Sequence, residues 1–263
     1  MTAQTASHHG PSRSVSDDAA LSRSLLIICA HGSAYHPTAN DHVIKIAEQL
    51  RQSGSFFDVQ AVFHTGKATE WSVTNISPSA IDQILIVPYM MSDGFLAKQM
   101  INKTKQAIRD AGIQTPVFGS PAVGTHPLIA DLALKLAIDT TTEYGTSPDE
   151  ISLVIVAHGS RNAPQSRLGA EQHLQSIQEK GVFKRTALAL IEEPPFVTDI
   201  LRTIDGPAVV VGLFAAPGGH AIVDIAEAIA EAARDDLMDA GPIGLHTDMH
   251  ELIQRRSLQT LDH

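Results

Sequence analysis

The chain contains two copies of one short motif, and each copy ends a run of apolar residues. Ala-His-Gly-Ser occupies residues 30–33 and again residues 157–160, closing the runs LLIICAHGS and SLVIVAHGS. Both runs are short, rich in branched residues and apolar without alternation, which is typical of a strand buried on both faces. An internal repeat of this kind predicts two structurally similar halves.

Two further pairs of segments follow in the same order. Residues 84–95 (ILIVPYMMSDGF) correspond to residues 209–220 (VVVGLFAAPGGH), and residues 120–129 resemble residues 241–253. Segments with apolar residues at intervals of three and four lie between the apolar runs and predict amphipathic helices. Alternating buried strands and helices predict an α/β fold of two similar lobes, each a mostly parallel sheet flanked by helices.

The domain organisation follows from composition along the chain. Residues 1–24 are rich in Ser, Thr, Ala and His and are predicted to form a disordered tail. The turn-rich stretch TTTEYGTSPDE predicts a boundary between an N-terminal lobe, residues 25–145, and a C-terminal lobe, residues 146–263. The apolar run after the tail is far shorter than the roughly 20 residues of a membrane span. The start also lacks the basic region of a secretory signal, so we expect a cytoplasmic protein without a membrane partner.

Overall charge and cysteine content exclude some classes of function. The 263 residues carry a net charge of −10, which disfavours a nucleic-acid partner. The single cysteine, Cys29, lies inside the first apolar run, where a buried, unreactive thiol is expected. A nucleotide-binding domain is also disfavoured, because no glycine-rich phosphate loop follows either first strand.

Chemically active side chains stand at predicted strand ends. In parallel sheets ligands bind at the carboxyl ends of the strands, where His31 and His158 are expected. An isolated His-Gly-Ser also fits a histidine that only caps a helix or bonds a carbonyl group. His220 adds weight, because it follows Gly218-Gly219 and is expected at a helix N-terminus, which keeps the imidazole neutral. Two neutral histidines facing one cleft suit Co²⁺, Ni²⁺, Fe²⁺ or Zn²⁺.

A carboxylate is expected at the same edge of the second sheet. The predicted strand TALALIEE ends in Glu192 and Glu193, which would complete a His/Glu/His set. Such a carboxylate could bind the metal or act as a general base. Alternatively, Pro194-Pro195 starts a helix and the glutamates only favour its positive end. The residues alone leave both interpretations open.

These motifs resemble those of the CbiX-type sirohydrochlorin chelatases, the cobaltochelatases and related ferrochelatases. The resemblance covers nearly the whole chain after the tail and is strongest at AHGSRNAP, ALALIEEPP and LFAAPGGHAIVDI. It implies insertion of a divalent metal, as substrate, into sirohydrochlorin or a related tetrapyrrole without an organic cofactor. Co²⁺ is favoured, with Fe²⁺ and Ni²⁺ as alternatives. A non-catalytic metal or tetrapyrrole carrier of the same fold is the second hypothesis.

The resemblance also implies roles for individual residues. His158 and His220 match the two metal-contacting histidines, and Glu192 is preferred over Glu193 as the acidic partner. Substrate-contacting residues are expected beside them, namely Ser160, Arg161, Gly218 and Gly219. Arg161 is the preferred cation for the carboxylates of the ring, ahead of Arg167, Lys184 and Arg185.

The N-terminal half departs from the pattern. It keeps His31 but has Phe95 where the second copy has His220, and His64 lies near the position of the glutamates. We therefore expect this half to have lost metal chemistry and to supply the other wall of the cleft, with an apolar surface from Met90, Met91 and Phe95. His126 and His246, after the last strand of each half, are expected to be structural.

Overall fold

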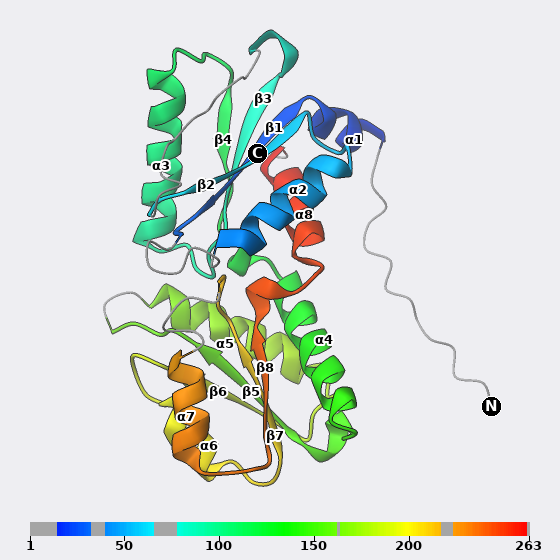
Figure 1. Cartoon of the computed structure of the whole chain (residues 1–263), viewed down its shortest axis with the longest axis vertical. Helices are drawn as coiled ribbons and strands as arrows, with labels where there is room; N and C mark the ends of the chain where they lie inside the picture. The colour runs from blue at the N-terminus through cyan, green and yellow to red at the C-terminus, as the bar shows by residue number, and fades with distance from the viewer. Residues whose placement is uncertain (1–14, 33–39, 66–77, 162–163, 217–222, 262–263) are drawn as a thin grey trace, which may run out of the picture.

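The computed structural model describes residues 15–32, 40–65, 78–161, 164–216 and 223–261. They form two four-stranded sheets with the orders β2-β1-β3-β4 and β6-β5-β7-β8, and all strand pairs are parallel. The predicted α/β fold with two similar lobes is confirmed (Figure 1). The strands are β1 Ser24–Ala30, β2 Asp58–Phe63, β3 Gln83–Pro88, β4 Val117–Gly119, β5 Ser152–Ala157, β6 Arg185–Leu190, β7 Ala208–Gly212 and β8 Leu237–Pro242.

Helices cover both sheets. No helix in the described part of the chain is long and apolar enough to cross a membrane. The helices are α1 Val15–Ser22, α2 Asp41–Gln52, α3 Phe95–Asp110, α4 Leu128–Glu143, α5 Gln165–Gln178, α6 Val197–Thr203, α7 Ile225–Ala232 and α8 Met249–Leu261. Amphipathic segments predicted from the sequence form four of these eight described helices, α2, α3, α4 and α7.

The start of the chain differs in part from the predicted disordered tail. Helix α1 lies inside the segment 1–24, and strand β1 already begins at Ser24. The helix contacts β1 and α8, and its Leu21 side chain is fully buried. Burial of this apolar side chain stabilises the folded helix. The polar composition of residues 1–24 gave no sign of this contact. Residues 1–14 lie outside the described part.

The first strand of each half is central in its sheet and completely buried. Every residue of β1 and of β5 is buried, as their apolar runs predicted. Cys29 lies in β1, and burial raises the pKa of its thiol to about 12. The thiol is therefore protonated at neutral pH, which agrees with the expected unreactive role.

Two helices are exchanged between the halves of the chain. Helix α4, from the first repeat, packs on β7, β8 and α5, whereas α8, from the second repeat, packs on β3 and α2 (Figure 1). The predicted division into 25–145 and 146–263 therefore separates the sequence repeats but not the spatial lobes. An amphipathic pattern predicts that a helix buries one face, but it does not specify which sheet is covered.

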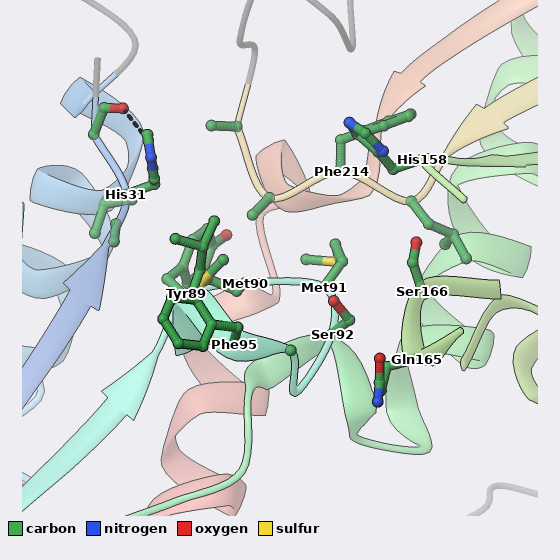
Figure 2. Close-up of a pocket in the computed structure, with 18 of the residues that line it drawn as sticks. His31, Tyr89, Met90, Met91, Ser92, Phe95, His158, Gln165, Ser166 and Phe214 are labelled. Atoms are coloured by element: carbon green, nitrogen blue, oxygen red, sulfur yellow. Dashed lines mark hydrogen bonds between the residues drawn. The ribbon is translucent and has the colours of Figure 1, made fainter. Parts of the chain in front are cut away.

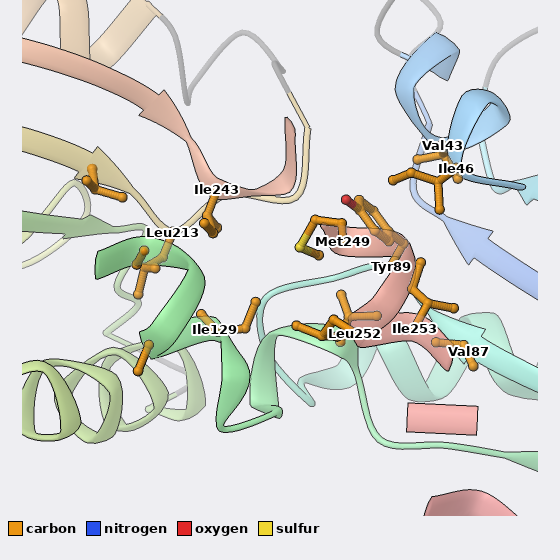
Figure 3. Close-up of a cluster of buried hydrophobic side chains, with 14 of the residues drawn as sticks. Val43, Ile46, Val87, Tyr89, Ile129, Leu213, Ile243, Met249, Leu252 and Ile253 are labelled. Carbon is orange, nitrogen blue, oxygen red and sulfur yellow. The ribbon is translucent and has the colours of Figure 1, made fainter. Parts of the chain in front are cut away.

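The exchange produces a core that continues from one lobe to the other. Met249, Leu252 and Ile253 of α8 are fully buried and lie beside Tyr89 of the first lobe (Figure 3). Ile129 of α4 belongs to the same cluster and packs within the second lobe.

Hydrogen bonds tie the lobes together, and a close backbone approach within the first lobe lies beside them. The Tyr89 hydroxyl donates to the carbonyl oxygen of Gly244 at 2.5 Å, and His173 Nε2 lies 2.7 Å from the carbonyl oxygen of Gly124. A Cβ atom on Gly124 would lie 2.1 Å from Met91 Cα. Only glycine allows this backbone approach at the junction.

His126 and His246 occupy equivalent positions before the exchanged helices. Nδ1 of His126 accepts the Leu128 backbone N–H at 3.1 Å, and Nδ1 of His246 accepts the Asp248 N–H at the same distance. Each ring therefore accepts a hydrogen bond from a backbone N–H near the start of a helix. This contact agrees with the structural role expected for both histidines.

Candidate functional site

The two sheets point their carboxyl strand ends at one cleft between the lobes. The cleft has a volume of about 510 Å³ and is bordered by residues that follow β1, β3, β5 and β7. His31 lies on one side and His158 on the other, with Met90 and Met91 between them (Figure 2). Strand-end loops of both lobes thus form a single site, and its size suits a small molecule.

The contact of His158 with the next residue determines which ring nitrogen carries the proton when the imidazole is neutral. It directly follows β5, is exposed, and its Nδ1 lies 2.9 Å from the carbonyl oxygen of Gly159. A carbonyl oxygen only accepts hydrogen bonds, so Nδ1 carries the proton of the neutral ring and Nε2 carries the lone pair. His31 repeats the arrangement, with Nδ1 3.0 Å from the carbonyl oxygen of Gly32.

The turn after His158 is held by side chains that follow it in sequence. Glu193 Oε1 accepts the Ser160 backbone N–H at 3.0 Å, and Ser166 Oγ accepts the Gly159 N–H at 3.2 Å. Gly159 has φ +70°, a left-handed conformation that favours glycine. Arg167 approaches the second Glu193 oxygen at 3.5 Å. Glu193 is therefore engaged in shaping the turn that carries His158.

Glu192 lies at the same strand end but in a different environment. Its backbone N–H donates to the His158 carbonyl oxygen at 2.9 Å, and its side chain is exposed. Within the described part of the chain, no hydrogen bond or ion pair engages its carboxylate. Of the two glutamates, Glu192 is thus the one whose charge is available beside His158.

Three residues of the predicted site lie outside the described residues. They are the predicted metal ligand His220 and the predicted substrate contacts Gly218 and Gly219. Among the residues that the structure describes, no three His, Cys, Asp or Glu side chains gather closely enough to hold an ion.

Backbone hydrogen bonds give the correspondence between the two lobes at this edge. The N–H groups of His64 and Thr65 donate to Ala30 and His31, just as those of Ile191 and Glu192 donate to Ala157 and His158. Thr65, rather than His64, is therefore the counterpart of Glu192. His64 lies near the position of the glutamates, as predicted, and one residue before the counterpart of Glu192. The first lobe therefore lacks the carboxylate as well.

The expected cations differ in their suitability. Arg161 is exposed beside the His158 turn, whereas Arg167 pairs with Glu171 and Glu193. Lys184 and Arg185 stand at the amino end of β6, opposite the end that borders the cleft. Their predicted contact with the ligand was therefore wrong, because the amino and carboxyl ends of a strand lie at opposite edges of the sheet.

The cleft wall of the first lobe is largely apolar. Met90, Met91, Phe95 and Leu96 all line it, and Phe95, the first residue of α3, is 76% exposed. Phe214 adds an aromatic side chain from the second lobe. An apolar wall with polar groups at its edge is typical of small-molecule sites.

Several cleft residues were missed by the sequence analysis. Gln165 and Ser166 line the cleft from the start of α5, and His42 lines it from α2. His42 Nε2 also lies 2.9 Å from the carbonyl oxygen of Ala215 in the other lobe. These residues form no motif with the strand ends, and only the packing of the lobes brings them to the site.

Known solved structures share the fold. CbiX, described as the terminal enzyme of sirohaem biosynthesis in denitrifying bacteria, superposes with a TM-score of 0.67 at 20% identity, covering 89% of this chain and 97% of that chain. SirB from Bacillus subtilis with Fe³⁺ gives a TM-score of 0.71 at 14% identity, covering 90% and 95%. A multi-domain protein of Deinococcus radiodurans with similarity to chelatases gives 0.72 at 23% identity, covering 90% of this chain and 54% of that one.

Sequence comparisons agree with the structural ones. A probable sirohydrochlorin cobaltochelatase of Halobacterium salinarum is 30% identical over 135 residues, which are 48% of this chain and 46% of the relative. The match therefore spans about half the length of that relative. The CbiX family model matches residues 25–140 and again residues 152–260, so nearly the whole described chain is covered by two copies. The chain belongs to the CbiX family.

Proposed function

We propose that the protein is a chelatase that inserts a divalent metal into sirohydrochlorin or a related tetrapyrrole. The observation that carries this proposal is the position of His158, which presents a metal-binding imidazole to a cleft with an apolar opposite wall. Membership of the CbiX family and the partial match to a probable cobaltochelatase support it.

In this proposal the C-terminal half provides the chemistry. His158, His220 and Glu192 hold the incoming metal, while Ser160 and Arg161 contact the ring together with Gly218 and Gly219. The metal exchanges its protein ligands for the ring nitrogens, and two pyrrole protons leave. The exposed Glu192 carboxylate beside His158 is suited to accept a proton at this stage.

The N-terminal lobe provides the surface against which the ring lies. Met90, Met91 and Phe95 form an apolar wall. Thr65, the counterpart of Glu192, supplies no carboxylate on this side of the cleft. A flat macrocycle stacked on this wall would present its central nitrogens to His158. Polarisable thioethers and an aromatic ring suit such a surface.

Co²⁺ is the metal that we favour, with Fe²⁺ and Ni²⁺ as alternatives. The relative from Halobacterium is named a cobaltochelatase, and Bacillus SirB has been crystallised with cobalt and with Fe³⁺. Imidazole and carboxylate ligands bind all these metals, so availability in the cell contributes to the choice.

Absorbance of sirohydrochlorin during incubation with Co²⁺, and anaerobically with Fe²⁺, tests the proposal. Protein-dependent insertion should fall at least about a hundredfold in His158→Ala and in His220→Ala, because each loses a metal ligand. His31→Ala should keep a larger share of the activity than either of these variants, because His31 is not a metal ligand in this proposal. Ring or metal binding without faster insertion by the wild type would contradict the chelatase proposal and favour a carrier.

A further inference from the structure

Three nitrogen-bearing side chains gather at the edge of the cleft in the N-terminal lobe. Lys103 Nζ, on α3, lies 3.1 Å from His64 Nε2. The rings of His64 and His31 meet edge to face, with centroids 6.3 Å apart. His31 lines the cleft, as does Phe63, the residue before His64. This cluster of His31, His64 and Lys103 is therefore continuous with the proposed ring site.

The hydrogen bond to Lys103 makes this cluster a poor metal site. An ammonium group only donates, so Nε2 of His64 accepts and its lone pair is already used. Burial, followed by the charges of Lys103 and His31, lowers the pKa of His64. A divalent cation placed here would also be repelled by the ammonium group. The cluster instead offers N–H donors and positive charge.

Lys103 has no carboxylate partner among the described residues. Two other lysines pair with carboxylates, Lys135 with Asp248 at 2.6 Å and Lys180 with Asp131 at 2.5 Å. Lys103 is held against a histidine instead, and its charge remains available to an anion from outside the chain.

The position of Lys103 on α3 relates the cluster to the cleft. Leu96 lines the cleft, and Lys103 follows it by seven residues, which is close to two helical turns. The two side chains thus share one face of α3 and lie about 10 Å apart along its axis. A ring on the apolar wall would extend its peripheral groups toward Lys103.

The two lobes therefore carry opposite charges at matching strand ends. The second lobe has Glu192 after β6, whereas the first has uncharged Thr65 after β2, with His64 and Lys103 beside it. Negative charge suits the incoming metal on one side. Positive charge suits the carboxylate side chains at the periphery of sirohydrochlorin on the other.

We propose that His31, His64 and Lys103 form a carboxylate-binding site that holds a peripheral carboxylate of the tetrapyrrole substrate. Lys103 supplies the charge, His64 orients the ammonium group and offers its Nδ1–H, and the ring of His31 packs against that of His64. The inference rests on the proposed function for the identity of the ligand. Its test uses ring binding alone, and so does not depend on turnover.

Titration of the full-length protein with metal-free sirohydrochlorin, followed by fluorescence quenching, measures this binding. Lys103→Gln should raise the Kd roughly three- to tenfold, as expected for a lost charge-assisted contact, and Lys103→Glu should raise it further. Added salt should weaken the wild type more than Lys103→Gln. Lys105→Gln, with the same charge change on the opposite face of α3, is the matched control and should bind like the wild type.

The fully methyl-esterified ring distinguishes a carboxylate contact from an effect on packing. The wild type and Lys103→Gln should bind this ester with the same Kd. A Kd that is still higher in Lys103→Gln would overturn the proposal. An unchanged Kd for sirohydrochlorin in both Lys103 variants would also overturn it. So would Co²⁺ binding that disappears in His64→Ala, because the cluster would then be a metal site. Absence of metal insertion by the wild type would contradict the chelatase proposal only.

Discussion

At the scale of single residues, the adjacent glutamates after β6 have different surroundings and should respond differently to substitution. Glu193→Gln weakens the contact of Oε1 with the Ser160 N–H and the approach of Arg167. We expect the free energy of unfolding to fall by about 1 kcal/mol and metal insertion to slow, because the turn that carries His158 loosens. Urea unfolding and initial rates measure the two effects.

Glu192→Gln is the matched change one residue earlier. Its exposed side chain supports no contact within the described chain, so stability should stay within about 0.5 kcal/mol of the wild type. Metal insertion should nevertheless fall, because a charged group beside His158 is lost. If Glu192→Gln lost stability and Glu193→Gln retained both properties, the two roles would have to be exchanged.

Residue-level prediction from the sequence was limited by register. The repeat correctly placed His31 and His158 at equivalent strand ends, because the motif itself marks the point at which each strand stops. It placed His64 near the position of the glutamates but could not identify Thr65 as the counterpart of Glu192, since only backbone hydrogen bonds show that pairing. It also could not choose between the glutamates, because the bond from Ser160 to Glu193 is a tertiary contact.

At the scale of elements, Gly124 and Gly244 determine how closely the last strand loops approach the neighbouring loops. An added Cβ would lie 2.1 Å from Met91 Cα at the first position and 2.2 Å from the Ala215 carbonyl oxygen at the second. These neighbours are backbone atoms that cannot rotate away. Gly124→Ala and Gly244→Ala should each lower the free energy of unfolding by about 3 kcal/mol, measured by urea denaturation.

Gly169 provides the control for this prediction. It lies inside α5, and an added Cβ would meet nothing within 4 Å. Alanine is favoured over glycine in a helix interior, so Gly169→Ala should raise stability by about 0.5–1 kcal/mol. Equal effects of all three substitutions would show that crowding at the junction does not determine the loss of unfolding free energy.

The sequence predicted the elements better than their partners. The sequence showed the buried strands β1 and β5 and the amphipathic helices, because local patterns of apolar residues indicate which side chains are buried. It did not show the exchange of α4 and α8, since either sheet could cover their apolar faces. Cleft residues such as His42 and Gln165 were missed for the same reason, because they reach the site through tertiary packing.

At the scale of the whole molecule, the exchanged helices make each lobe depend on the other half of the chain. A fragment of residues 1–145 lacks α8, so Val87 and Tyr89 would lose the apolar cover of Leu252 and Ile253. We expect this fragment to lack a cooperative thermal transition in circular dichroism and to regain one when mixed with residues 146–263. Cooperative folding of the fragment alone would contradict the idea that each lobe depends on a helix from the other half of the chain.

The buried His126 and His173 and the half-buried His246, all at the lobe junction, should make the molecule sensitive to acid. Burial is the main cause that lowers the pKa of His126, to about 4, and also lowers the pKa values of His173 and His246. In the unfolded chain these groups take up protons near their ordinary pKa of 6.5. The unfolded state therefore binds more protons below that pH, and stability should fall as the pH drops from 6.5 toward 4.

Replacing one of these histidines tests this dependence directly. In His126→Asn the side-chain oxygen can still accept the Leu128 N–H, but the group no longer titrates. The urea midpoint of the variant should therefore change less between pH 7 and pH 5 than that of the wild type. His250→Asn makes the same substitution at a partly exposed position near the start of α8 and is the matched control variant. An identical dependence in His126→Asn and the wild type would mean that protonation of His126 does not couple acid to unfolding of the junction.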